Sequence, residues 1–214
     1  FENDYPIISK VKSSSDNRIY NFSIHVAPKV IRIFDSIRGP LQRHEKRFRI
    51  GNLQKGARTR DYQNAFFWLD EARIVNTCYA ATEPSIGLKL NRDDAKYKLY
   101  FADTGLLISH SFDENEILSE KLYAKLLLDK IEINKGMIVE NLVAQMFRAS
   151  GKKLYYYTQS SRDNSEDNIE IDFLIRKPIV TSRHNICPVE VKSSNNYKTS
   201  SLIKFRNKFS QYLH

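Results

Sequence analysis

Residues 170–175 read EIDFLI and residues 186–194 read ICPVEVKSS, and these two stretches decide the fold. Each alternates apolar and polar residues with a period of two, which is typical of a β-strand. The residues between them include Lys177-Pro178 and Arg183-His184-Asn185, which favour a turn region. The two stretches are therefore predicted to form neighbouring strands joined by a turn.

In the first strand, one acidic residue, Asp172, lies between apolar neighbours. Side chains of a strand point alternately to its two faces, so Ile171, Phe173 and Ile175 are expected to share one face. Asp172 then points to the other face.

The second strand carries an acid and a base two residues apart. Cys187 and Val189 are expected to share a face, with Cys187 as a small buried hydrophobic residue. Glu190 and Lys192 then lie together on the opposite side. Because paired strands lie about 4.8 Å apart, Asp172, Glu190 and Lys192 can converge on one small patch.

This patch has a chemical use in phosphodiester hydrolysis. Mg²⁺ or Mn²⁺ binds carboxylate and water oxygens and can turn a bound water into a nucleophile. Asp172 and Glu190 would hold the metal, and Lys192 would orient the water or offset charge on the phosphate. The alternative is that all three are ordinary solvent-facing residues of a half-exposed strand.

A third carboxylate lies on a predicted helix at residues 134–150, which Gly151 would end. Glu140 falls on or beside the apolar stripe of that helix. A carboxylate there is costly unless a partner or a metal compensates it. The alternative is that Glu140 reaches a nearby Lys or Arg.

Taken together, these motifs resemble the PD-(D/E)XK nuclease superfamily. The resemblance is carried by GMIVENLV at residues 136–143, LYYY at 154–157, EIDFLI at 170–175 and PVEVKS at 188–193. More closely, the chain is similar to the C-terminal region, of unknown function, of archaeal and bacterial AAA+-type ATPases. This resemblance covers most of the chain, from about Arg18 to the end. It implies that Glu140, Asp172 and Glu190 bind metal and that Lys192 assists catalysis.

The family combines an ATPase module, a winged-helix segment and a nuclease-like domain. We therefore expect an α/β protein with three parts: a linker or remnant of a missing ATPase module at residues 1–20, a winged-helix domain at 21–108 and a nuclease-like domain at 109–214. The chain has no G-x-x-x-x-G-K-[ST] phosphate loop. It would bind ATP only through the missing N-terminal module.

The composition favours an anionic partner. The chain carries 34 basic and 25 acidic residues, a formal net charge of +9, and its pI is near 9.4. Nucleic acid, and DNA first, is the expected partner. The two cysteines are too few and too far apart for a disulfide framework or a zinc finger. The sequence has no apolar run near the roughly 20 residues that span a bilayer and no signal peptide, which indicates a cytoplasmic protein without a membrane partner.

A basic segment precedes a predicted helix at 59–72 and strands at 74–79 and 96–102. Helices followed by a β-hairpin describe a winged helix-turn-helix. Its candidate nucleic-acid contacts are Arg43, Lys46, Arg47, Lys55, Arg58 and Arg60. The alternative is a protein-docking surface or a structural spacer.

Periodicity predicts two short helices between residues 20 and 53, further helices at 116–130 and 200–213, and a strand at 152–158. Pro28 is expected to begin a helix and Gly39-Pro40 to break one. The rings of Tyr155, Tyr156 and Tyr157 are not all expected to be buried in one strand, because neighbouring side chains face opposite sides.

The leading functional hypothesis is metal-dependent phosphodiester cleavage by the nuclease-like domain. The second is a catalytically inactive regulatory or interaction module of an ATP-binding protein. The choice between DNA and RNA stays open, and so does a homo-oligomer in which a second subunit helps to clamp a duplex.

Overall fold

The computed structural model describes residues 17–42, 47–111, 135–161, 167–180, 185–194 and 198–210. The predicted helix at 116–130 lies outside these ranges. The described helices are α2 (Asn17–Ser36), α3 (Arg38–Gln42), the short 3-10 helix η1 (Ile50–Asn52), α4 (Thr59–Glu71), α5 (Thr104–Ser111), α7 (Lys135–Ala149) and α8 (Ser200–Lys208). The strands are β1 (Val75–Ala81), β2 (Arg92–Phe101), β3 (Leu154–Gln159), β4 (Ile169–Ile171), β5 (Phe173–Arg176) and β6 (Ile186–Val189).

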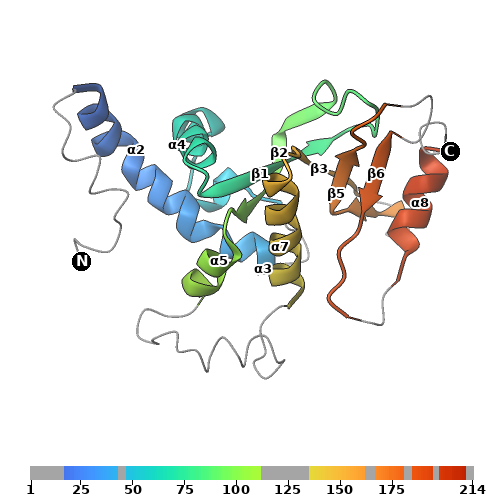
Figure 1. Cartoon of the computed structure of the whole chain (residues 1–214). Coiled ribbons are helices and arrows are strands. Elements are labelled where there is room, and N and C mark those ends of the chain that lie inside the picture. The colour runs from blue at the N-terminus through green and yellow to red at the C-terminus, as the bar shows by residue number, and fades with distance from the viewer. Residues whose placement is uncertain are drawn as a thin grey trace.

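The strands form a sheet in the order β2-β1-β3-β4 and a pair β5-β6. β1 pairs antiparallel with β2 and parallel with β3, and β4 pairs antiparallel with β3. The chain is thus an α/β protein, as predicted. Figure 1 shows α2, α4 and α5 gathered at one end, α8 at the opposite end and α7 between them. None of the helices in the described ranges is both long and apolar enough to cross a membrane.

The larger sheet draws strands from both segments that the sequence analysis treats as separate domains. β1 and β2 come from residues 21–108, whereas β3 and β4 come from residues 109–214. The order of α4 followed by the antiparallel pair β1-β2 matches the predicted helix and hairpin. The hairpin is nevertheless joined to β3 through backbone hydrogen bonds and does not stand apart as a wing.

A bend at Asp172 separates β4 from β5. β5 pairs antiparallel with β6, as the two stretches predicted. The bend also changes the faces of the strand: Phe173 and Ile175 pack in one hydrophobic cluster, whereas Ile171 packs with Leu174 in another. The prediction that Ile171 shares a face with Phe173 is therefore wrong, because the alternation is interrupted at Asp172.

Both faces of β3 are covered. Tyr156 belongs to the cluster formed with α2, α4, α5 and α7, and Tyr155 and Tyr157 belong to the cluster formed with α8. All three tyrosines are buried, at 7%, 1% and 5% exposure in chain order. The prediction that one ring faces away from its neighbours is confirmed, but the prediction that the three rings are not all buried is wrong, because helices cover both faces of the strand.

The N-terminal helices also differ from the prediction. Pro28 lies inside the long helix α2 and does not begin a helix, and Gly39-Pro40 lies within α3. Proline has no N–H to donate to the carbonyl four residues earlier, so α2 lacks one backbone hydrogen bond at Pro28. Val30, Ile33 and Ile37 pack this segment onto the core.

The two cysteines are expected to react differently with iodoacetamide. Cys78 in β1 is fully buried, and burial raises the pKa of its thiol. Cys187 is exposed, so the prediction that it is buried is wrong: β6 pairs only with β5 in the described sheets, which leaves its side chains near an edge. The native chain should take one label, at Cys187, and a second only after unfolding. Peptide mass spectrometry checks this, and rapid labelling of native Cys78 would contradict its burial.

Candidate functional site

A buried lysine lies at the centre of the site. Lys98 is on β2, opposite Cys78 of β1, and only 1% of its side chain is exposed. Its Nζ lies 3.6 Å from Glu140 Oε1, 3.0 Å from Glu170 Oε1 and 3.5 Å from Asp172 Oδ1. Carboxylates from two distant parts of the sequence, at residue 140 and at residues 170 and 172, thus meet around one ammonium group.

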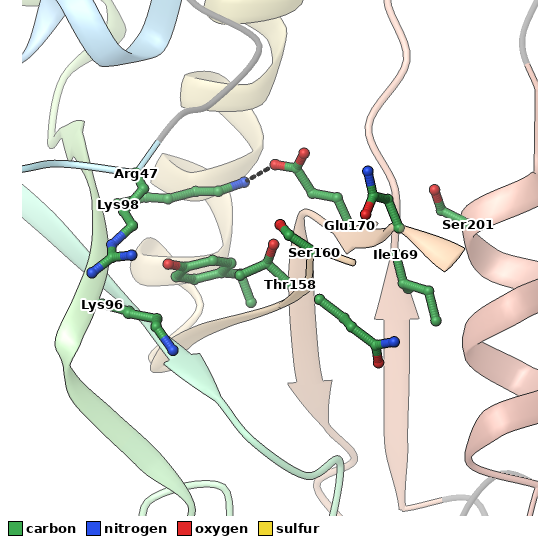
Figure 2. Close-up of a pocket in the computed structure, with 11 residues that line it drawn as sticks. Arg47, Lys96, Lys98, Thr158, Ser160, Ile169, Glu170 and Ser201 are labelled. Atoms are coloured by element: carbon green, nitrogen blue, oxygen red, sulfur yellow. Dashed lines mark hydrogen bonds and ion pairs between the residues drawn. The ribbon is translucent and has the colours of Figure 1, made fainter. Parts of the chain in front are cut away.

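The carboxylates come from three separate places. Glu140 is on α7 and is buried, Glu170 is on β4 and is partly exposed, and Asp172 is buried in the bend between β4 and β5. The short contact from Lys98 to Glu170 is drawn in Figure 2. We refer to Lys98, Glu140, Glu170 and Asp172 as the carboxylate cluster.

Lys98 stays protonated in this environment. Burial acts to lower the pKa of the ammonium, but the charges of Glu140, Glu170 and Asp172 outweigh it and raise the pKa above the usual range for lysine. Three carboxylates against one ammonium leave a formal excess of two negative charges in the cluster.

Glu140 is held from the sheet side by a tyrosine. The hydroxyl of Tyr100, on β2, donates to Glu140 Oε1 over 2.6 Å. Burial, and then the charge of Glu140, raise the pKa of Tyr100, so the phenol remains protonated and can donate. Glu140 therefore accepts from Tyr100 and pairs with Lys98 through the same oxygen.

α7 is fastened to the end of β2 by a buried amide. Asn141 Oδ1 accepts from the N–H of Phe101 at 2.8 Å, and Asn141 Nδ2 donates to the carbonyl of Phe101 at 3.1 Å and to Thr104 Oγ1 at 3.0 Å. Asn141 is fully buried. These bonds fix the position of the neighbouring Glu140 along the sheet.

Glu190 and Lys192 form a second group beside the cluster. Phe173 pairs with Val189, so Asp172 and Glu190 lie at the same end of the β5-β6 pair. The N–H of Val191 donates to Asp172 Oδ2 over 2.9 Å. Lys192 Nζ lies 2.5 Å from Glu190 Oε1, and the other oxygen of Glu190 is buried without a hydrogen-bond partner among the described residues.

The structure thus brings Glu140 and Asp172 together through Lys98, and it places the Glu190-Lys192 pair next to Asp172. The sequence analysis missed Lys98 and Glu170. A lysine within the apolar run at residues 97–101 is the signal that could have pointed to Lys98, because such a strand is buried on both faces.

The predicted Mg²⁺ or Mn²⁺ does not fit this arrangement. The oxygens and the excess negative charge suit a hard divalent cation, which would bind at about 2.0–2.6 Å from its ligands. The space between the oxygens is instead filled by Lys98 Nζ. Within the described ranges, no group of three or more His, Cys, Asp or Glu residues is arranged to hold a metal ion.

The structure describes four of the six predicted nucleic-acid contacts. Arg43 and Lys46 lie outside the described residues. Lys55, Arg58 and Arg60 are exposed, and Arg60 Nε lies 3.7 Å from Asp61 Oδ1. Arg47 is partly buried and lines a pocket with Lys98.

Two family models match different parts of the chain. One, described as a domain of unknown function (DUF8612), matches residues 20–116, and the other, described as a domain of unknown function (DUF4143), matches residues 135–213. The second is a domain found in ATPase-associated proteins. No curated protein and no solved structure shows significant similarity to the chain.

Proposed function

We propose that this chain is the nucleic-acid-binding C-terminal part of an AAA+-type ATPase, and that its PD-(D/E)XK nuclease-like core and the helices and hairpin joined to it bind nucleic acid without cutting it. The single observation that carries the proposal is Lys98, whose ammonium lies against Glu140 and Asp172, two of the three carboxylates predicted to hold the metal.

A built-in cation has a different effect from a bound one. An ammonium neutralises part of the negative charge and holds the carboxylates together, but it has no water ligand to turn into a nucleophile. The cluster then acts as a structural element that joins β2, α7 and the β4-β5 bend. The surface around the carboxylate cluster can still bind nucleic acid.

Binding is supported by charge. The net charge of +9 favours an anionic polymer, and Lys55, Arg58 and Arg60 are exposed where phosphates can reach them. The match of residues 135–213 to a domain found in ATPase-associated proteins supports the link to an ATPase module.

The proposal is tested by binding and cleavage assays on the same DNA. Fluorescence anisotropy with labelled duplex, single-stranded and branched DNA should show binding that weakens at least tenfold between about 50 and about 200 mM salt. Affinity should be no higher in Mg²⁺ than in EDTA, and denaturing gels should show no cut products. Absence of binding at low salt would overturn the nucleic-acid assignment.

Metal-dependent phosphodiester cleavage is the second candidate. The excess of two negative charges in the carboxylate cluster favours it, as does the Glu190-Lys192 pair beside Asp172. Cut products that appear with Mn²⁺ or Mg²⁺ and disappear in Asp172→Ala and Lys192→Ala would decide for this candidate and against the non-cutting one.

A further inference from the structure

A pocket of about 620 Å³ opens beside the carboxylate cluster. It lies between β2, β3, β4 and the first turn of α8, and its basic and hydroxyl-bearing side chains are shown in Figure 2. The residues used below are Arg47, Lys96, Lys98, Tyr156, Thr158 and Ser201. The pocket has three cations against one carboxylate, Glu170, which is engaged with Lys98.

Two buried polar atoms of this lining lack a partner. Arg47 Nε and the hydroxyl of Tyr156 make no hydrogen bond with the described residues. Tyr156 as a whole is only 1% exposed. A buried polar group without a hydrogen-bond partner destabilises the folded chain. A ligand that satisfied both atoms would recover part of that cost.

The hydrogen-bonding properties of these two atoms specify what kind of ligand could bind them. A guanidinium N–H can only donate, so the partner of Arg47 has to be an acceptor, and the Tyr156 hydroxyl can donate to the same group. The hydroxyls of Thr158 and Ser201 line the same pocket and add further donors.

The charges of the lining point to an anion. Lys96 Nζ pairs with Asp93 at 3.0 Å, and Lys98 pairs with the carboxylate cluster. Arg47 appears in none of the ion pairs found among the described residues, and its Nη2 makes only a 3.3 Å contact with the carbonyl of Ala95. Arg47 is therefore the cation of this lining that can meet an incoming anion, and its planar fork matches the oxygens of a phosphate.

We propose that this pocket binds a phosphate group, to which Arg47 Nε and the Tyr156 hydroxyl donate. The expected source is the backbone or the end of a nucleic-acid strand, and in this respect the inference rests on the proposed function. A free phosphate or mononucleotide carries the same chemistry, so the experiment separates the two sources.

The experiment uses Arg47→Gln, Tyr156→Phe and a control, Arg73→Gln, which removes the same charge from an exposed position outside the pocket and outside the predicted nucleic-acid contacts. Titration calorimetry measures the affinity of the pocket for inorganic phosphate and for AMP. Fluorescence anisotropy measures the affinity of each variant for labelled DNA. Arg47→Gln is expected to weaken phosphate binding about tenfold. Tyr156→Phe should weaken it several-fold without lowering the melting temperature, because the Tyr156 hydroxyl has no hydrogen-bond partner to lose in the part of the chain that the structure describes.

The outcomes are distinct. If phosphate competes with DNA and both pocket variants lose more DNA affinity than Arg73→Gln does, the proposal stands with a strand as the source. If both pocket variants lose affinity for phosphate and AMP but keep their affinity for DNA, the phosphate site stands and its source is a free phosphate or nucleotide. If DNA binds but phosphate does not, and the pocket variants bind DNA as Arg73→Gln does, the pocket proposal fails while the proposed function survives.

Discussion

Replacing Lys98 with methionine is expected to lower the free energy of unfolding by about 3–5 kcal/mol. The substitution keeps the length and apolar stem of the side chain but removes the ammonium that Glu140, Glu170 and Asp172 share. Two of these carboxylates are buried, so their charges would lose their main compensation. Urea unfolding followed by circular dichroism measures the change.

The matched control is Lys96→Met, two residues earlier on the same strand. Lys96 is 45% exposed and pairs with Asp93 near the surface, so its loss should cost less than about 1 kcal/mol. Equal losses for the two variants would contradict the central role of Lys98.

Two further measurements identify the cause of the loss in Lys98→Met. A buried carboxylate without a cation nearby is easier to protonate, so the deficit of the variant should shrink as the pH falls from 8 to about 5. Mn²⁺ should raise the melting temperature of Lys98→Met, in which the space between the carboxylates is free of charge, and leave that of the parent chain unchanged. If the stability difference between Lys98→Met and the parent chain changes with neither pH nor Mn²⁺, lost packing and not lost charge compensation explains it.

Replacing Asn141 with leucine is expected to cost about 2–4 kcal/mol of unfolding free energy. The change removes all three hydrogen bonds of the Asn141 amide and leaves the N–H and carbonyl of Phe101 without their side-chain partner inside the core. Denaturant unfolding of both proteins measures the difference.

Leu142→Ala is the control for Asn141→Leu. Leu142 follows on the same helix, is 44% exposed and should change stability by less than about 1 kcal/mol. If Asn141→Leu were as stable as this control, the hydrogen bonds between α7 and the end of β2 would contribute nothing measurable to the free energy of unfolding.

Local patterns predicted most of the elements. The helices at residues 59–71 and 135–149 and the strand at 154–159 lie within a few residues of their predicted ranges, because 3.6-residue and two-residue periods are properties of neighbouring side chains. The antiparallel pairing of β5 with β6 followed from the same alternation.

The candidate site was predicted only in part, because tertiary contacts complete it. Glu140 and Asp172 stood out as acids in apolar surroundings, but the role of Lys98 depends on β2 entering the same sheet as β3 and β4. Neither that pairing nor the cover that α8 gives to Tyr155 and Tyr157 leaves a trace in local sequence. The bend at Asp172 likewise interrupts a run that reads as one continuous strand.

The parallel pairing of β1 with β3 limits how evolution can rearrange this gene. Recombination could separate the segment that ends near residue 111 from the segment that starts near residue 135. Each product would then expose an unpaired strand edge, on β1 in one and on β3 in the other. Such edges are templates for aggregation, which selection removes. The two matched regions are therefore expected to fold as one unit, even though separate family models match them.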